Sequence, residues 1–372
     1  MKKKIPVLRP KLPDAQSLLP YLLRTDESRI YSNFGPLAVE FQSRLAMQLG
    51  VAPESVISAS CGTNALIAAI LGGAGVPTNS RPYAIIPSFT FVATAIAAER
   101  CGFQPYFVDV DPNSWTLDAF KMLEHPILDH AGVIIPVAPF GRPVLQQDWL
   151  AFRERSGVPA VIDAGASLSC IIDDSHSFIG SIPTAFSLHA TKSFGIGEGG
   201  CVISTEGDVI ARVGASLNFG FIETRDSAIP SLNGKLSEYH AAVGLALLSC
   251  WKEKWATVSR VVRCYRDEFG RHGLSERFFS LPQIDGSYAL FLCGTGKEAG
   301  QIMSALERDC IDFRLWYGAG VHRHTHFLNA ARDDHLPVTE RLGCTLIGLP
   351  MAPDLQLPDI ARVAAVVSST QY

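Results

Sequence analysis

The strongest constraint on the fold is a regular alternation of short apolar runs with helix-like segments between residues 56 and 204. The apolar runs are seven candidate strands, at residues 56–59, 83–86, 105–108, 133–137, 160–162, 185–188 and 201–204. The candidate helices between them lie at residues 64–71, 93–100, 117–123 and 147–155. Continuous apolar strands that alternate with helices are typical of a mostly parallel sheet covered on both faces. We therefore expect an α/β fold with a mostly parallel, seven-stranded sheet.

Other helical and strand patterns lie on both sides of this sheet region. An amphipathic helix is expected at residues 37–49, before the first strand, and a long helical pattern covers residues 235–269. The remainder is of α+β type, with expected strands at 288–293, 312–316 and 346–349 and expected helices at 297–308 and 357–369. We predict a large domain over residues 1–250 and a smaller C-terminal domain over residues 251–372.

The composition limits the classes of function. The chain has 372 residues, of which 47% are hydrophobic and 18% charged, so a sizeable core is expected. The net charge is −4, with no basic block beyond Lys2 to Lys4, which does not suggest a nucleic-acid surface. No apolar run is long enough for a membrane span, and Pro6, Arg9, Pro10 and Lys11 interrupt any signal-peptide core after the N-terminal lysines. Nine scattered cysteines, without a Cys-x-x-Cys pair, predict reduced thiols in the cytoplasm and no metal site.

The most informative single residue is Lys192, in a polar turn between two apolar runs. A glycine-rich segment, residues 195–200, follows it and is expected to be a flexible loop. Burial lowers the pKa of a lysine toward the range in which its amine is nucleophilic, as a Schiff-base lysine requires. On this stretch alone, a surface loop lysine explains the sequence equally well.

Two further sites lie where expected strands end. Asp163 closes the apolar run 160–162, and the carboxyl end of a strand in an open α/β sheet faces the ligand crevice. Gly62, Thr63 and Asn64 lie at a strand-to-helix junction, where free helix amides can bind a phosphate. The simpler alternatives are a helix cap or a salt bridge for Asp163, and an ordinary N-cap at Thr63 and Asn64. Taken together, a lysine, an acid and an anion cradle suggest pyridoxal phosphate.

Phe91 and a group of three histidines also have both a functional and a simpler explanation. Phe91 follows another expected strand and can stack on a flat cofactor, although a core phenylalanine explains it as well. The histidines His322, His324 and His326 resemble a metal cluster, but no neighbouring acid or cysteine completes a ligand set. Substrate contact or a plain surface position is the better explanation for them.

In this combination the sequence resembles the DegT/StrS family of sugar aminotransferases, which are fold-type I pyridoxal-phosphate enzymes. The similarity runs over most of the chain. The matching segments are residues 35–41, Cys61-Gly-Thr-Asn-Ala-Leu, Pro87-Ser-Phe-Thr-Phe-Val-Ala-Thr, residues 105–111, Asp163-Ala-Gly-Ala, Phe186-Ser-Leu-His-Ala-Thr-Lys, Gly197-Glu-Gly-Gly and residues 233–242. The spacing Ser-x-x-x-x-Lys followed by Gly-Glu-Gly-Gly is its most specific part.

The resemblance implies a role for each matching residue. Lys192 matches the lysine that joins the cofactor covalently, and Asp163 matches the carboxylate paired with the pyridinium nitrogen. Gly62, Thr63 and Ser187 match the phosphate cradle. The remaining matches are Phe91, as the aromatic stacked on the ring, and Asn233, as a residue that reaches the phosphate of a neighbouring subunit in a homodimer.

Two positions depart from the family pattern. Ala166 stands where the family carries glutamine or histidine, so a side chain that contacts the cofactor is missing and another group or water must replace it. Lys235 stands where the family carries arginine, and the two are not equivalent as anion partners.

The resemblance implies an aminotransferase that moves an amino group from L-glutamate, which becomes 2-oxoglutarate, to a keto sugar, usually nucleotide-linked. Residues 195–200 and the C-terminal domain, with His322 to His326, are expected to shape the sugar pocket. Two alternatives remain open, a pyridoxal-phosphate-dependent sugar dehydratase and a catalytically silent binding protein on the same scaffold.

Overall fold

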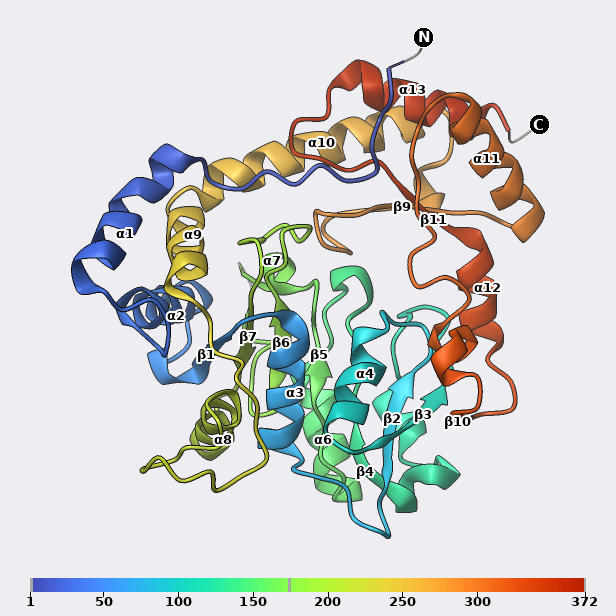
Figure 1. Ribbon diagram of the computed structural model, residues 1–372. Helices are drawn as coiled ribbons and strands as arrows, with labels where there is room; N and C mark the ends of the chain where they lie inside the picture. The colour runs from blue at the N-terminus through green and yellow to red at the C-terminus, as the bar shows by residue number, and fades with distance from the viewer. Residues whose placement is uncertain (1–2, 173–174, 371–372) are drawn as a thin grey trace.

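The computed structural model describes residues 3–172 and 175–370, and its centre is a twisted β-sheet (Figure 1). The strands follow the orders β1-β7-β6-β5 and β4-β2-β3-β10. Their bounds are β1 (Val56–Ala59), β2 (Tyr83–Pro87), β3 (Gln104–Val108), β4 (Ala131–Ile134), β5 (Ile162–Asp163), β6 (Thr184–Ser187), β7 (Gly200–Ile203) and β10 (Ala331–Arg332). All seven expected strands are therefore present, within a few residues of their predicted ends.

The two groups of strands form one continuous sheet. Parallel pairings of Ile134 with Ala160 and of Val137 with Asp163 join β4 to β5. β7 runs antiparallel to both of its neighbours, β1 and β6, and the other pairings are parallel. The expectation of a mostly parallel, seven-stranded sheet is confirmed, and β10 adds a short eighth strand at the edge beside β3.

Helices cover both faces of the sheet because side chains alternate along each strand. Ile85 of β2 packs into a cluster with residues of α2, α6 and α9, whereas its neighbours Ala84 and Ile86 pack with residues of α3, α4 and α8. The bounds of these helices are α2 (Pro36–Leu49), α3 (Gly62–Gly73), α4 (Ala93–Arg100), α6 (Gln146–Ser156), α8 (Gly207–Leu217) and α9 (Glu238–Ser249), with short α5 (Ala119–Met122) and α7 (Leu168–Ile171). Strands buried on both faces explain the continuous apolar runs in the sequence.

The C-terminal part is built around a second, antiparallel sheet of order β11-β9-β8. Its elements are β8 (Phe278–Phe279), β9 (Ala289–Leu292), β11 (Leu346–Leu349), α10 (Trp251–Arg271), α11 (Gly296–Arg308), α12 (Pro337–Thr345) and α13 (Leu357–Ser368). The long helical pattern is two helices, α9 and α10, because the backbone leaves the helical conformation at Cys250. The expected strand at 312–316 is wrong. Only Arg314 pairs there, with Gly348, before left-handed residues at Tyr317 and Gly318 turn the chain.

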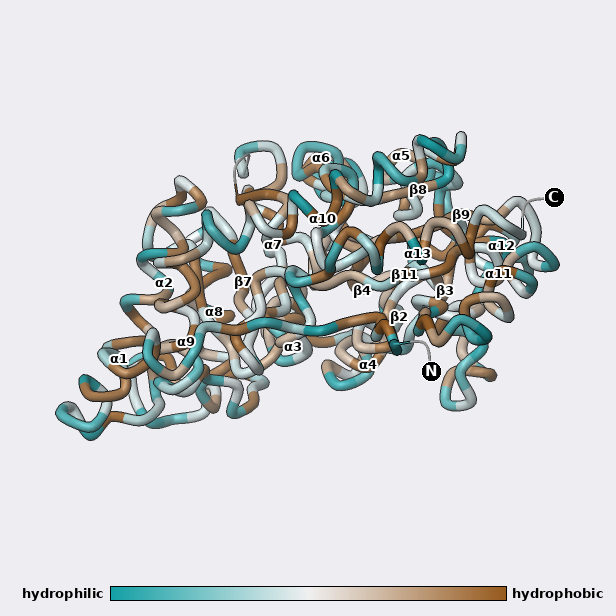
Figure 2. Tube along the Cα trace, turned by 90° about the horizontal axis from the view of Figure 1, so that it is seen from above, coloured by the Kyte–Doolittle hydropathy of each residue, from teal (hydrophilic) through white to brown (hydrophobic). Residues whose placement is uncertain are grey.

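The N-terminal segment packs against elements near the C-terminal end of the chain. Ile5 pairs with Ile311 and Leu8 with Met351, and the chain then crosses to α1 (Ala15–Ser28), as Figure 2 shows from above. Ile5 is buried in the same cluster as α10, α11 and α13. The division of the chain at residue 250 stays a prediction, but these first residues pack with the C-terminal elements. None of the helices in the described part of the chain has the length and apolar character to cross a membrane.

Glu238 ties two helices of the large layer together. Its carboxylate accepts hydrogen bonds from the amides of Leu37 (2.7 Å) and Ala38 (2.9 Å), in the first turn of α2. The glutamate is fully buried, so these two helix amides take the place of water in stabilising its charge. A negative charge at a helix N-terminus is favourable, which explains how this acid is tolerated in the core.

We expect Glu238→Ala to lower the free energy of unfolding by about 2 kcal/mol, since it leaves two buried amides without acceptors. Glu238→Gln keeps one acceptor oxygen and should cost less. Urea titration monitored by circular dichroism measures both. Equal stability of Glu238→Ala and the unmodified chain would show that α2 does not depend on this contact.

Candidate active site

A cavity of about 590 Å³ opens where the carboxyl ends of β5 and β6 meet the start of α3. Parallel strands bring their carboxyl ends to one edge, so side chains from distant parts of the sequence converge there. Six of the seven residues predicted to act on the cofactor line this cavity: Gly62, Thr63, Phe91, Asp163, Ser187 and Lys192. Asn233 does not line it, and lies exposed between α8 and α9. The individual roles of these residues stay predictions.

Asp163 is a half-buried acid in the cavity wall. Its Oδ2 accepts a hydrogen bond from Oγ1 of Thr94 (2.7 Å), and its Oδ1 accepts one from the amide of Gly165 (3.1 Å). Burial raises the pKa of the Asp163 carboxyl, while these hydrogen bonds and the charge of Lys192 oppose the rise. The site thus holds a carboxyl whose ionised form would gain from a cationic group placed beside it in the cavity.

Lys192 reaches the same cavity from the turn after β6. Its Nζ donates a hydrogen bond to the hydroxyl of Tyr288 (3.1 Å) and lies 5.7 Å from the centre of that ring. The backbone turn is closed by a hydrogen bond from the Lys192 amide to the carbonyl of His189 (2.8 Å). An amine and a half-buried acid therefore face one space, as the sequence predicted.

The start of α3 forms the anion-binding end of the cavity. The helix begins at Gly62 and its N-cap is Cys61, whose Sγ accepts from the amide of Asn64 (3.4 Å), so the expected capping by Thr63 and Asn64 is wrong. A Cβ atom on Gly62 would lie 2.6 Å from Cβ of Ser187. Glycine is required here because the helix start and the end of β6 are in direct contact. The free first-turn amides and the Ser187 hydroxyl together suit a phosphate.

Phe91 stands at the mouth of the cavity. It lines the cavity although 64% of its surface is exposed, whereas its neighbour Phe89 is fully buried. The alternative of a core phenylalanine therefore applies to Phe89 and not to Phe91. An exposed ring beside a cavity is available for stacking on a flat ligand.

The glycine-rich segment after Lys192 is firmly packed, in contrast to the expected flexible loop. Backbone hydrogen bonds join Leu188 to Gly199 (2.9 Å), Ala190 to Gly197 (2.8 Å) and Ile196 to Leu188 (2.8 Å). Ile196 is 1% exposed, which anchors the segment in the core below the sheet edge. Glu198 projects from it into the cavity and lies 3.5 Å from Nε2 of His189.

Residues of the C-terminal part form the opposite wall, and no local sequence pattern predicts them. These residues are Tyr288, Arg314, Trp316 and Tyr317. The expectation that His322 to His326 shape the pocket is wrong, because none of the three histidines lines it. His322 is buried against Ser88 (Nδ1–Oγ 2.6 Å), and His326 pairs with Glu99 (2.9 Å). Among the residues that the structure describes, no cluster of metal-ligating side chains is present.

The two departures from the family pattern have different surroundings. Ala166 lines the cavity and packs in one buried cluster with Phe140 and Tyr288. Lys235 is buried, and its Nζ lies 4.3 Å above the ring of Phe219 with no hydrogen-bond partner in the described part of the chain. Burial lowers the pKa of the Lys235 amine.

We expect Asp163→Asn to raise the melting temperature of the cofactor-free protein at pH 7. The raised pKa of Asp163 means that this acid stabilises the fold at low pH and loses that contribution as the pH rises through its folded value. Asparagine has no charge to bury and can keep both hydrogen bonds. The gain should vanish near pH 4, where the acid is also protonated.

Scanning calorimetry between pH 4 and pH 8 measures this difference. The control is Asp354→Asn, which changes a partly exposed acid that pairs with Arg9. If the melting temperature at pH 7 rises equally in both variants, or does not rise in Asp163→Asn, burial of the Asp163 charge does not destabilise the folded protein as proposed.

Comparison with known proteins identifies the chain's relatives. Residues 14–368 match the DegT/DnrJ/EryC1/StrS aminotransferase family. Protein Rv3402c of Mycobacterium tuberculosis is 31% identical over 99% of this chain and 90% of its own length. The dTDP-4-amino-4,6-dideoxy-D-glucose transaminase of Escherichia coli is 27% identical over 98% of both chains. The crystal structure of DesI with its TDP-sugar product superposes with a TM-score of 0.85, at 27% identity, over 99% of this chain and 93% of that one. The chain therefore belongs to the DegT/DnrJ/EryC1/StrS family of pyridoxal-phosphate-dependent aminotransferases.

Proposed function

We propose that this protein transfers an amino group from L-glutamate to a keto sugar carried on a nucleotide. The observation that carries the proposal is the meeting of Lys192 and Asp163 in one cavity at the carboxyl edge of the sheet. The sugar part of the proposal is supported by the relatives, one of which is a dTDP-sugar transaminase and another was crystallised with a TDP-sugar.

The cavity fits pyridoxal phosphate in size and in the order of its polar groups. Its volume of about 590 Å³ lies in the usual range for cofactor sites. Lys192 would hold the aldehyde carbon, Asp163 the ring nitrogen, and Phe91 one face of the ring. Gly62, Thr63 and Ser187 would hold the phosphate. When bound, the cofactor supplies an electron sink for the carbon that bears the migrating amine.

The protein's own groups would bind the substrate and move the proton. Nζ of Lys192, once free, would take the proton from the amine-bearing carbon of glutamate. Asp163 would keep its partner nitrogen protonated, because the ionised form of this half-buried carboxyl gains most from a facing positive charge. The walls from the C-terminal part, Trp316 and Tyr317, would exclude water from this space.

A homodimer would complete the site. Asn233, which the resemblance assigns to a phosphate, is exposed and outside its own chain's cavity, so in this proposal it serves the cavity of a second copy. We place the enzyme in the cytoplasm, where the nine cysteines, free in the structure, would stay reduced.

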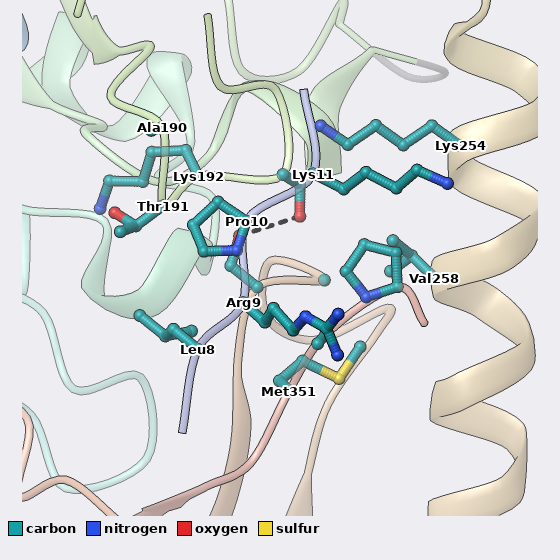
Figure 3. Close-up of a pocket in the computed structure, with 15 residues that line it drawn as sticks. Leu8, Arg9, Pro10, Lys11, Ala190, Thr191, Lys192, Lys254, Val258 and Met351 are labelled. Carbon is teal, nitrogen blue, oxygen red and sulfur yellow. Dashed lines mark hydrogen bonds between the residues drawn. The ribbon is translucent and has the colours of Figure 1, made fainter. Parts of the chain in front are cut away.

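With pyridoxal phosphate the purified protein should show a visible absorbance band that L-glutamate removes as 2-oxoglutarate forms. Lys192→Ala should abolish covalent attachment, because among the described residues no other lysine lines the cavity that contains Asp163. Borohydride reduction followed by mass spectrometry detects the attached cofactor. Lys254→Ala is the matched control. Figure 3 shows that Lys254 comes from α10 on the far side of the turn and that the side chain of Lys192 points away from it.

Attachment that survives Lys192→Ala would reject the assigned lysine. A coloured protein that responds to no amino donor but dehydrates a keto sugar would favour a dehydratase. A chain that binds no pyridoxal phosphate would favour a silent binding protein.

Arg314 is expected to bind a carboxylate of glutamate. Its guanidinium is exposed in the cavity wall and has no hydrogen bond or ion pair with any residue that the structure describes. Arg314→Ala should raise the glutamate concentration for half-maximal colour loss about tenfold, since a charge-assisted pair is lost, while Arg314→Lys should lose less. Stopped-flow absorbance measures this. An unchanged glutamate dependence with a raised KM for the nucleotide sugar would assign the guanidinium to the sugar substrate instead.

A further inference from the structure

One loop of the C-terminal part, residues 285–288, holds the turn that carries Lys192. Oγ of Ser193 donates to Oδ1 of Asp285 (2.9 Å) and lies 3.0 Å from Oγ of Ser287. Asp285 is fully buried and is itself fixed by its backbone amide, which donates to the carbonyl of Phe140 (2.8 Å). The loop therefore has a defined position relative to the turn, and the next residue along it is Tyr288.

Tyr288 places a hydroxyl directly on the amine of Lys192. Nζ of Lys192 donates to this hydroxyl at 3.1 Å. The ring is 8% exposed and is held edge-on by Phe140 (5.4 Å between centroids, 76°) and by Trp316 (5.4 Å, 86°). Because two aromatic neighbours fix the ring, the position of its hydroxyl oxygen is fixed as well.

We propose that Tyr288 is a further catalytic residue, whose hydroxyl keeps the amine of Lys192 in place while that amine gains and loses its proton. This proposal rests on the proposed function of Lys192. A neutral phenol can accept a hydrogen bond from an ammonium group and donate one to a free amine. It can thus stay bonded to Lys192 in both states, and it can donate to the lone pair of the free amine, which an ionised carboxylate cannot do.

The surroundings keep the phenol neutral. Burial, with the nearby charge of Asp285, raises the pKa of Tyr288 well above its usual value, so the hydroxyl retains its proton at neutral pH. Ala166 lies in the same cluster and lines the same cavity but carries no polar atom in its side chain. Tyr288 supplies a polar group on this wall that residue 166 does not.

Other titratable groups also act on Lys192, and the test must separate them from Tyr288. Three groups interact electrostatically with Lys192: Asp163 on β5, Asp285 in the loop before β9, and Tyr317 after the Arg314 pairing. His189, Glu198 and Arg314 line the same cavity as Lys192. Tyr288→Phe removes only the hydroxyl and keeps the ring between Phe140 and Trp316, so all of these groups remain in place.

The matched control is Tyr265→Phe. Tyr265 is also fully buried, and its hydroxyl donates to the carbonyl of Pro350 (2.7 Å), but it lies in the core of the C-terminal part and does not line the cavity. Each variant thus loses one buried tyrosine hydrogen bond, and only one of them loses the contact with Lys192.

The first measurement is the rate at which trinitrobenzenesulfonate modifies the Lys192 amine at one fixed pH in the cofactor-free full-length protein, read by peptide mass spectrometry. Tyr288→Phe should raise this rate about threefold, because the amine loses both the bond that stabilises its charged form and the bond that occupies its lone pair. Tyr265→Phe should leave it unchanged. This measurement is decisive even if glutamate proves not to be the donor.

The second measurement is the single-turnover loss of colour with L-glutamate in the cofactor-loaded protein. Tyr288→Phe should slow the maximal rate about fivefold, the effect of one oriented hydrogen bond, without raising the glutamate concentration for half-maximal rate. An unchanged rate of Lys192 modification in Tyr288→Phe, or equal effects of the two variants on that rate, would overturn the proposal and leave Tyr288 a packing residue.

Discussion

The site depends on the carboxylate of Asp163, which is half-buried and lines the cavity. Asp163 ends a buried strand, and only a hydroxyl, one amide and the charge of Lys192 offset the loss of its solvation. A half-buried acid of this kind is costly to an empty protein and gains its full value when a cation faces it. Thr94 on α4 and Lys192 after β6 are therefore held at defined distances from one strand end, and the sheet between them must be rigid.

The sheet supplies that rigidity through its double-sided burial. Successive residues of β2 and β6 enter opposite clusters, so each strand is gripped from both faces: Ala185 packs on one side, with α3, and Phe186 on the other, with α2 and α9. A shift of one residue in register would exchange the two faces and expose both clusters to the wrong helices. The carboxyl edge of the sheet is thus placed by packing, and the site inherits this placement.

The local sequence was sufficient to predict the central sheet and the cavity residues at the carboxyl ends of its strands. The alternation of apolar runs predicted all seven central strands, because strands buried on both faces leave a continuous signal. Asp163 and Lys192 could be singled out because each follows such a run. The family resemblance was needed for Ser187 and Asn233.

The cavity wall formed by the C-terminal part could not be predicted from local sequence. Tyr288 lies 96 residues from Lys192 along the chain, in a short loop whose position depends on the buried contact of Asp285 with Ser193. The mistaken strand around Arg314 failed because a single pairing with Gly348 holds that segment. The expected contribution of His322 to His326 to the pocket was wrong because tertiary contacts hold these residues elsewhere: Ser88 holds His322 in the core and Glu99 holds His326 at the surface.

The pairing of the first residues with the last elements has a consequence for how the chain is made. Synthesis proceeds from the N-terminus, and domains fold as they emerge from the ribosome. Ile5 and Leu8, however, find their partners only when Ile311 and Met351 have been translated, more than 300 residues later. The N-terminal segment therefore stays unpaired until nearly the whole polypeptide has been synthesised. Leu8 lines the cavity, so this part of the cavity is among the last to form.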